Sequence, residues 1–193
     1  MSPLIKNRLK LVFIATLFAL PVITAWTVFK NPQWLEGGKT KNHGELISPA
    51  IPSKLSDYII NGSDVDLADL SGRWVLLHLD LDGVCDKSCE KSVFTLRQLH
   101  VLLNKDAKRL KRVYFDKSNG ESKPFLVKDA LLKVFTWDQE NVQKLKTHIN
   151  NIVDGDMLLI DPLGNILMKY HHDADPYGIQ KDLKLLFKTS QIG

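Results

Sequence analysis

The sequence predicts a single α/β domain behind one N-terminal transmembrane helix. Three observations predict this class: an uncharged apolar run near the N-terminus, alternating strand-like and helical patterns after residue 70, and a length of 193 residues. About 160 residues follow the apolar run, which is enough for one compact core but hardly for two. We therefore expect four segments: an N-terminal segment at 1–10, an anchor at 11–29, a linker at 30–50 and the folded domain at 51–193.

The apolar run predicts a membrane anchor. Residues 11–29 contain no charged side chain, and at about 1.5 Å per residue such a helix spans roughly 28 Å, close to the hydrocarbon core of a bilayer. Lys6, Arg8 and Lys10 precede the run, so the positive-inside rule places the N-terminus in the cytoplasm and the domain across the membrane. We expect this membrane to be a bacterial inner membrane, with the domain in the periplasm. A cleavable signal peptide is the alternative, but the run exceeds a usual h-region and no small-residue cleavage site follows cleanly.

The net charge of +4 belongs to the anchor and not to the domain. Residues 1–30 hold four basic and no acidic residues, which leaves 22 of each sign in residues 31–193. A neutral domain gives no reason to expect a nucleic-acid partner. The one local basic cluster, at 105–112, is interpreted as a solvated helix end.

The first half of the domain alternates strand and helix patterns. Residues 31–50 are rich in Gly, Pro, Asn and Lys and have the composition of a linker. An apolar run at 74–79 predicts a strand that is buried on both faces. Helical spacing of apolar residues follows at 89–104, residues 113–115 predict a short strand, and 120–124 have the composition of a turn.

The second half completes a recognisable order of elements. Residues 131–137 predict a strand, and Asp138 follows as the N-cap of a helix to about Ile149. A hairpin with proline and glycine at its turn is predicted at 157–168, and an amphipathic helix at 176–188. The resulting order, βαβ then βα then ββα, is that of a thioredoxin-like domain.

The only two cysteines lie four residues apart, where the predicted strand at 74–79 gives way to a helix. If Cys85 and Cys89 both lie on the helix, their Cα atoms are about 6.2 Å apart, within the range that a disulfide bridges. A helix N-terminus favours the thiolate, which is the nucleophile and the metal-binding form. We therefore expect Cys85 and Cys89 to be catalytic thiols, and the same pair is a candidate binding site for a soft metal ion such as copper. A static structural disulfide is the alternative.

Aspartate and histidine residues affect thiolate formation and metal binding at Cys85 and Cys89. Four aspartates oppose thiolate formation if they lie close to the cysteines: Asp82, Asp86, Asp154 and Asp156. Copper held by two thiolates usually takes an imidazole as a third ligand. His78 is interpreted as a core residue of the buried strand. The segment His171–Asp175 has the composition of a metal site, but we interpret it as a polar loop that the usual thioredoxin topology keeps away from the cysteines.

The stretch from about Gly44 to Lys188 resembles the Sco family, membrane-anchored thioredoxin-like proteins that assist assembly of the binuclear copper centre of cytochrome c oxidase. The resemblance rests on the anchor, the prolines ahead of the domain, the strand GRWVLLHL, the Cys-x-x-x-Cys spacing and the hairpin LLIDPLGNIL. Two positions depart from the family pattern. Asp86 stands where a proline is usual, and Gly155 stands where the family has its ligand histidine. The resemblance therefore implies a divergent member in which copper binding does not carry over unchanged.

The resemblance implies a role in respiratory oxidase biogenesis, with a cytochrome c oxidase subunit or other assembly factors as partners. We expect thiol–disulfide exchange on copper-site cysteines, in which Cys85 attacks and Cys89 resolves. Two alternatives stay open: a copper metallochaperone, and a non-catalytic scaffold with inert cysteines. With an imidazole missing at Gly155, a Gly155→His substitution should raise copper affinity if the fold places this loop beside the cysteines, and His171 and His172 should matter little.

Overall fold

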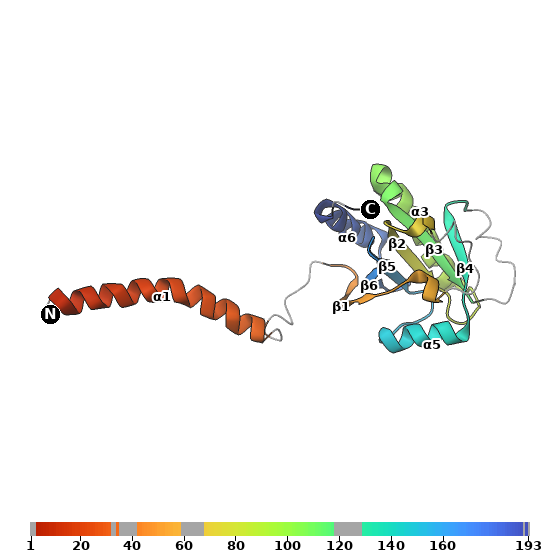
Figure 1. The fold of residues 1–193 in the computed structure, drawn as a ribbon. Coiled ribbons are helices and arrows are strands. Elements are labelled where there is room, and N and C mark those ends of the chain that lie inside the picture. The colour runs from red at the N-terminus through yellow and green to blue at the C-terminus, as the bar shows by residue number, and fades with distance from the viewer. Residues whose placement is uncertain are drawn as a thin grey trace. The chain divides into compact units, whose positions relative to one another are not determined.

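The computed structural model describes residues 3–31, 34, 42–58, 68–117, 129–190 and 192. Contacts divide the chain into two compact units, Met1–Lys41 and Asn42–Gly193. The first contains helix α1 (Pro3–Lys30), none of whose residues is buried. This 28-residue helix is long and apolar enough to cross a membrane. It covers the whole predicted anchor and continues through the basic residues before it (Figure 1).

The second unit is built on a six-stranded mixed sheet in the order β1-β6-β5-β2-β3-β4. Its strands are β1 (Glu45–Pro52), β2 (Trp74–Leu79), β3 (Leu110–Asp116), β4 (Leu132–Thr136), β5 (Met157–Ile160) and β6 (Asn165–Tyr170). Strands β2, β3 and β4 run parallel, whereas β5 pairs antiparallel with β2. The hairpin β5–β6 and the edge strand β1 extend the antiparallel side.

Helices cover both faces of this sheet (Figure 1). Helices α3 (Lys87–Leu103) and α6 (Pro176–Thr189) pack on one face, and α5 (Gln139–His148) with the short helix η2 (Leu55–Tyr58) packs on the other. A further short helix, η3 (Asn104–Arg109), follows α3. Successive side chains of β2 alternate between the two cores, so all six of its residues are buried. The prediction of a strand buried on both faces is confirmed.

The predicted elements after residue 74 are confirmed with small shifts of their ends. Helix α3 begins at Lys87, two residues earlier than expected, because the Asp86 side chain caps it. Asp138 caps α5, where its carboxylate accepts a hydrogen bond of 2.8 Å from the backbone N–H of Asn141. The turn predicted at 120–124 lies outside the described residues.

The structure adds strand β1, which lies largely in residues assigned to the linker at 30–50. The buried carboxylate of Asp182 on α6 accepts hydrogen bonds from the backbone N–H groups of His43, at 2.9 Å, and Gly44, at 3.0 Å. A Cβ at Gly44 would lie 2.5 Å from the ring of Tyr170, so this backbone packs directly on β6. These partners are far apart in the sequence, so no local sequence pattern predicts their contact. The compact unit accordingly starts at Asn42, before residue 51.

Candidate functional site

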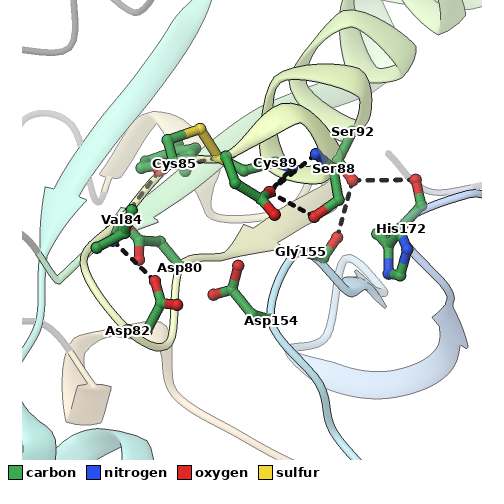
Figure 2. Close-up of a disulfide and its surroundings, with 12 residues drawn as sticks. Asp80, Asp82, Val84, Cys85, Ser88, Cys89, Ser92, Asp154, Gly155 and His172 are labelled. Carbon is green, nitrogen blue, oxygen red and sulfur yellow. Dashed lines mark hydrogen bonds between the residues drawn. A yellow bond between two sulfur atoms is a disulfide. The ribbon is translucent and has the colours of Figure 1, made fainter.

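The two cysteines meet where the loop after β2 enters α3. Cys85 and Cys89 form a disulfide with Cα atoms 5.1 Å apart (Figure 2). Cys89 lies in the first turn of α3 and is 1% exposed, whereas Cys85 precedes the helix and is half-buried. Only Cys89 lies on the helix, so the separation of about 6.2 Å that holds for two helical residues four positions apart does not apply. Asp86 between them has the extended backbone of an N-cap residue, which places Cys85 outside the helix.

The Asp86 side chain caps the N-terminus of α3, which would otherwise favour a thiolate at the cysteines. Its carboxylate accepts hydrogen bonds from the backbone N–H groups of Ser88, at 2.8 Å, and Cys89, at 3.1 Å, and from the Ser88 hydroxyl at 2.6 Å. These bonds, that of the Ser88 hydroxyl first, hold the pKa of Asp86 below its usual range. A negative charge thus stands between the two cysteines and opposes a second one on sulfur.

Two buried polar side chains, Tyr114 and Asp80, lie next to the sulfur of Cys89. The Cys89 Sγ lies 3.6 Å from the hydroxyl oxygen of Tyr114, and that hydroxyl donates a 3.0 Å hydrogen bond to Asp80. Both partners are almost fully buried. Burial, together with the Asp80 charge, raises the pKa of Tyr114 far above its usual range, so the side chain stays a phenol. Because its proton points at Asp80, the phenol oxygen can accept a hydrogen bond from the thiol of a reduced Cys89.

Sequence reasoning missed Asp80 and Tyr114. Their meeting depends on the register of β2 with β3, in which His78 pairs with Tyr114. The two rings stack with centroids 4.7 Å apart, and His78 is fully buried, so its interpretation as a core residue is confirmed. A signal was present in the position of Asp80, a charged residue directly after a fully buried strand.

Further carboxylates surround the loop that leads to Cys85. Asp80, Asp82 and Asp154 each place an oxygen within 4.8 Å of the others, and Figure 2 shows them gathered at this loop, to which Asp82 itself belongs. Burial raises the pKa of Asp154, and the nearby acids Asp82, Asp80 and Asp86 raise it further, against the hydrogen bond from the Leu81 N–H. Asp82 and Asp86 thus both lie close enough to Asp154 to act on its carboxyl group. Asp156 instead belongs to a different group, with His171 and His172.

The loop at His171–Asp175 lies closer to helix α3 than the usual thioredoxin topology suggested. Ser92, three residues after Cys89 on α3, places its hydroxyl 3.0 Å from the carbonyl oxygen of Gly155 and 3.1 Å from that of His172 (Figure 2). Gly155 has a φ of +79°, and a Cβ there would lie 3.0 Å from the His172 Cβ. His172 therefore occupies the space that a side chain at 155 needs. A histidine introduced at Gly155 would be strained and crowded, which argues against the expected gain in copper affinity.

The described residues do not assemble a copper site of two thiolates and one imidazole. The sulfur atoms of Cys85 and Cys89 are bonded to each other, and a disulfide offers no thiolate to a metal. Neither of the two groups of closely spaced ligand atoms among the described residues includes a cysteine. In this form the pair is a disulfide.

A match to a family model shows which family the chain belongs to. Residues 74–190 match the family described as transmembrane-like, thioredoxin-like, C-terminal domain. The chain belongs to this family. The matched region begins with β2 and ends just after α6, so it contains the cysteine pair and the aspartates around it. A comparison with curated proteins found no match.

Solved structures share the fold at low sequence identity. The apo Sco1 protein of Thermus thermophilus is 13% identical with a TM-score of 0.57, and the match covers 78% of this chain and 99% of that one. BsSco, a Sco family protein in which a disulfide switch was identified, is 16% identical with a TM-score of 0.50, covering 72% and 99%. A thiol:disulfide interchange protein from Bacteroides sp. is 15% identical with a TM-score of 0.50, covering 79% and 95%. These likenesses confirm a thioredoxin-like, Sco-like fold.

Proposed function

We propose that this protein is a membrane-anchored periplasmic thiol–disulfide oxidoreductase that assists cytochrome c oxidase assembly by reducing the copper-site cysteines of a partner. The observation that carries this proposal is the disulfide between a half-buried Cys85 and a buried Cys89 at the start of α3. Two proteins of similar fold support the chemistry: a thiol:disulfide interchange protein, and BsSco with its disulfide switch. The latter belongs to a family of cytochrome c oxidase assembly proteins, which supports the choice of partner.

The different burial of the two cysteine residues supports the roles that we propose for them. In the reduced protein, the Cys85 thiolate attacks one sulfur of the partner's disulfide, and the other partner sulfur leaves as a thiolate. Cys89 then attacks Cys85 in the mixed disulfide, which re-forms the internal bond and releases the partner with two thiols. Two electrons pass to the partner in each cycle, and a dithiol reductant must restore the pair.

The Tyr114–Asp80 pair provides a route for the proton of Cys89. The thiol gives its proton to the phenol oxygen, 3.6 Å away, while the phenol gives its own proton to the Asp80 carboxylate, 3.0 Å away. Burial of Cys89 favours the protonated thiol until this transfer occurs. The second attack is then delayed until Cys85 has captured the partner.

The acidic surroundings favour the reducing direction. Carboxylates near the pair destabilise thiolates relative to the neutral disulfide, so the dithiol readily gives up its electrons. Asp86 is the nearest in sequence, and its hydrogen bonds keep it ionised. The charge pattern is therefore that of a reductant and not of an oxidant.

Trapping of the mixed disulfide tests this function. In the full-length chain, Cys89→Ser should accumulate a disulfide between Cys85 and a partner, because the resolving thiol is gone. The matched variant, Cys85→Ser, should trap far less. Mass spectrometry of the trapped species identifies the partner, and an oxidase subunit or assembly factor is expected. Unchanged oxidase activity in cells that carry only the double Cys→Ser variant would instead favour a scaffold.

A further inference from the structure

A second cluster of ligand-type side chains lies at one end of the β5–β6 hairpin. Asp156 directly precedes β5, and His171 and His172 directly follow β6. In the register of this hairpin Met157 pairs with Tyr170, so the residues flanking that end are brought together. Each of the three offers one ligand atom, and these atoms all lie within 4.8 Å of one another.

Two buried polar atoms in this cluster have no hydrogen-bond partner within the part of the chain that the structure describes. Asp156 is 1% exposed, and its Oδ2 accepts a 3.1 Å hydrogen bond from the backbone N–H of Val153. Its Oδ1 has no partner among the described residues, and neither has the buried Nδ1 of His172. Leaving such atoms unpaired is unfavourable, and native proteins rarely do so. The arrangement therefore calls for a bound group that both a carboxylate oxygen and an imidazole nitrogen can bind.

The third residue is already oriented for such a role. The Nδ1 of His171 lies 2.6 Å from the Asp173 carboxylate and can donate its proton there, which leaves Nε2 as the acceptor nitrogen. A histidine held by a carboxylate in this way is typical of metal ligands. The His171 side chain is also 53% exposed, so an ion can reach the cluster from solvent.

We propose that Asp156, His171 and His172 bind a divalent first-row transition-metal ion through two imidazole nitrogens and one carboxylate oxygen. This donor set suits Zn²⁺ and Cu²⁺, with Cu²⁺ bound more tightly. Ca²⁺ and Mg²⁺ prefer oxygen ligands alone and are not expected to compete. The site uses no cysteine. Figure 2 places Ser92 between the disulfide-bearing turn and the loop of His172, and the Ser92 hydroxyl contacts that loop at 3.1 Å.

Metal titration of the oxidised protein separates this site from the cysteines. Full-length protein in detergent, with its disulfide formed, is titrated with Cu²⁺ and separately with Zn²⁺ against a chromophoric chelator. One ion per chain is expected, with Cu²⁺ the tighter. His171→Ala, His172→Ala and Asp156→Asn should each weaken binding by at least about tenfold. Two controls should bind as wild type: a Cys85→Ser, Cys89→Ser double variant, and His148→Ala, which removes an exposed histidine on α5.

Electron paramagnetic resonance of the Cu²⁺ form gives a signature that a structural role cannot imitate. Coupling to two imidazole nitrogens is expected, falling to one in His171→Ala. His171 is exposed, so this variant remains informative even if circular dichroism shows that Asp156→Asn is unfolded. Absence of saturable binding, wild-type affinity in both histidine variants, or an equal loss in His148→Ala would overturn the proposal. The proposed exchange chemistry of Cys85 and Cys89 would be untouched by any of these results.

Discussion

At the scale of single residues, Asp86 sets the electrostatics of the cysteine pair. Asp86→Asn removes the charge but keeps a side chain that can cap α3. The equilibrium with glutathione should move toward the dithiol, by no more than about fivefold because the charge is exposed. Quantifying the reduced fraction in glutathione buffers measures the shift. Asp138→Asn, the same change at the N-cap of α5, should leave the equilibrium unchanged. A shift toward the disulfide, or equal shifts in both variants, would contradict this assignment.

Tyr114 is expected to contribute to stability through its buried hydrogen bond to Asp80. Tyr114→Phe leaves this carboxylate without one of its donors, so the free energy of unfolding should fall by about 1–3 kcal/mol. Urea denaturation of the oxidised protein provides the measurement. Tyr177→Phe is the control, because Tyr177 is 59% exposed and should change stability little. Equal effects of the two substitutions would remove the special role of Tyr114.

At the scale of elements, local patterns predict what local interactions build. Apolar spacing locates β2 and α6, and the cap at Asp138 locates α5, because these features need only near neighbours in the chain. Such analysis does not predict strand β1. The residues that lead into this strand are held by Asp182 on α6, which accepts hydrogen bonds from the backbone N–H groups of His43 and Gly44. The site divides in the same way. The spacing of the cysteines is visible in the sequence, whereas the contact of Cys89 with Tyr114 requires the sheet register.

The attachment of β1 gives a prediction at this scale. Gly44→Ala should lower the free energy of unfolding by about 1–3 kcal/mol, because its Cβ would lie 2.5 Å from the buried ring of Tyr170. Urea denaturation provides the measurement. An unchanged free energy of unfolding in Gly44→Ala would contradict the tight packing of β1.

At the scale of the whole molecule, we propose that the first unit anchors the protein and the second carries its chemistry. Helix α1 carries the excess of basic charge, and the domain carries the cysteine pair. We expect an uncleaved anchor with the domain outside the cytoplasm. Alkaline phosphatase fused at the C-terminus should be active, whereas a fusion after Lys10 should not, and carbonate washing should leave the protein in the membrane. Recovery of a soluble periplasmic form that begins after Trp26 would contradict the anchor.

The proposed function requires that the disulfide between Cys85 and Cys89 open and close reversibly in the folded protein. The most direct measurement equilibrates the full-length protein in glutathione buffers of graded potential, quenches it with acid, alkylates free thiols and counts adducts by mass spectrometry. Molecules with no adduct or with two adducts should interconvert in one transition, at a potential reducing enough for the pair to act as a donor. Two thiols that stay alkylatable in oxidising buffer, or a disulfide that opens only when the protein unfolds, would contradict the exchange mechanism.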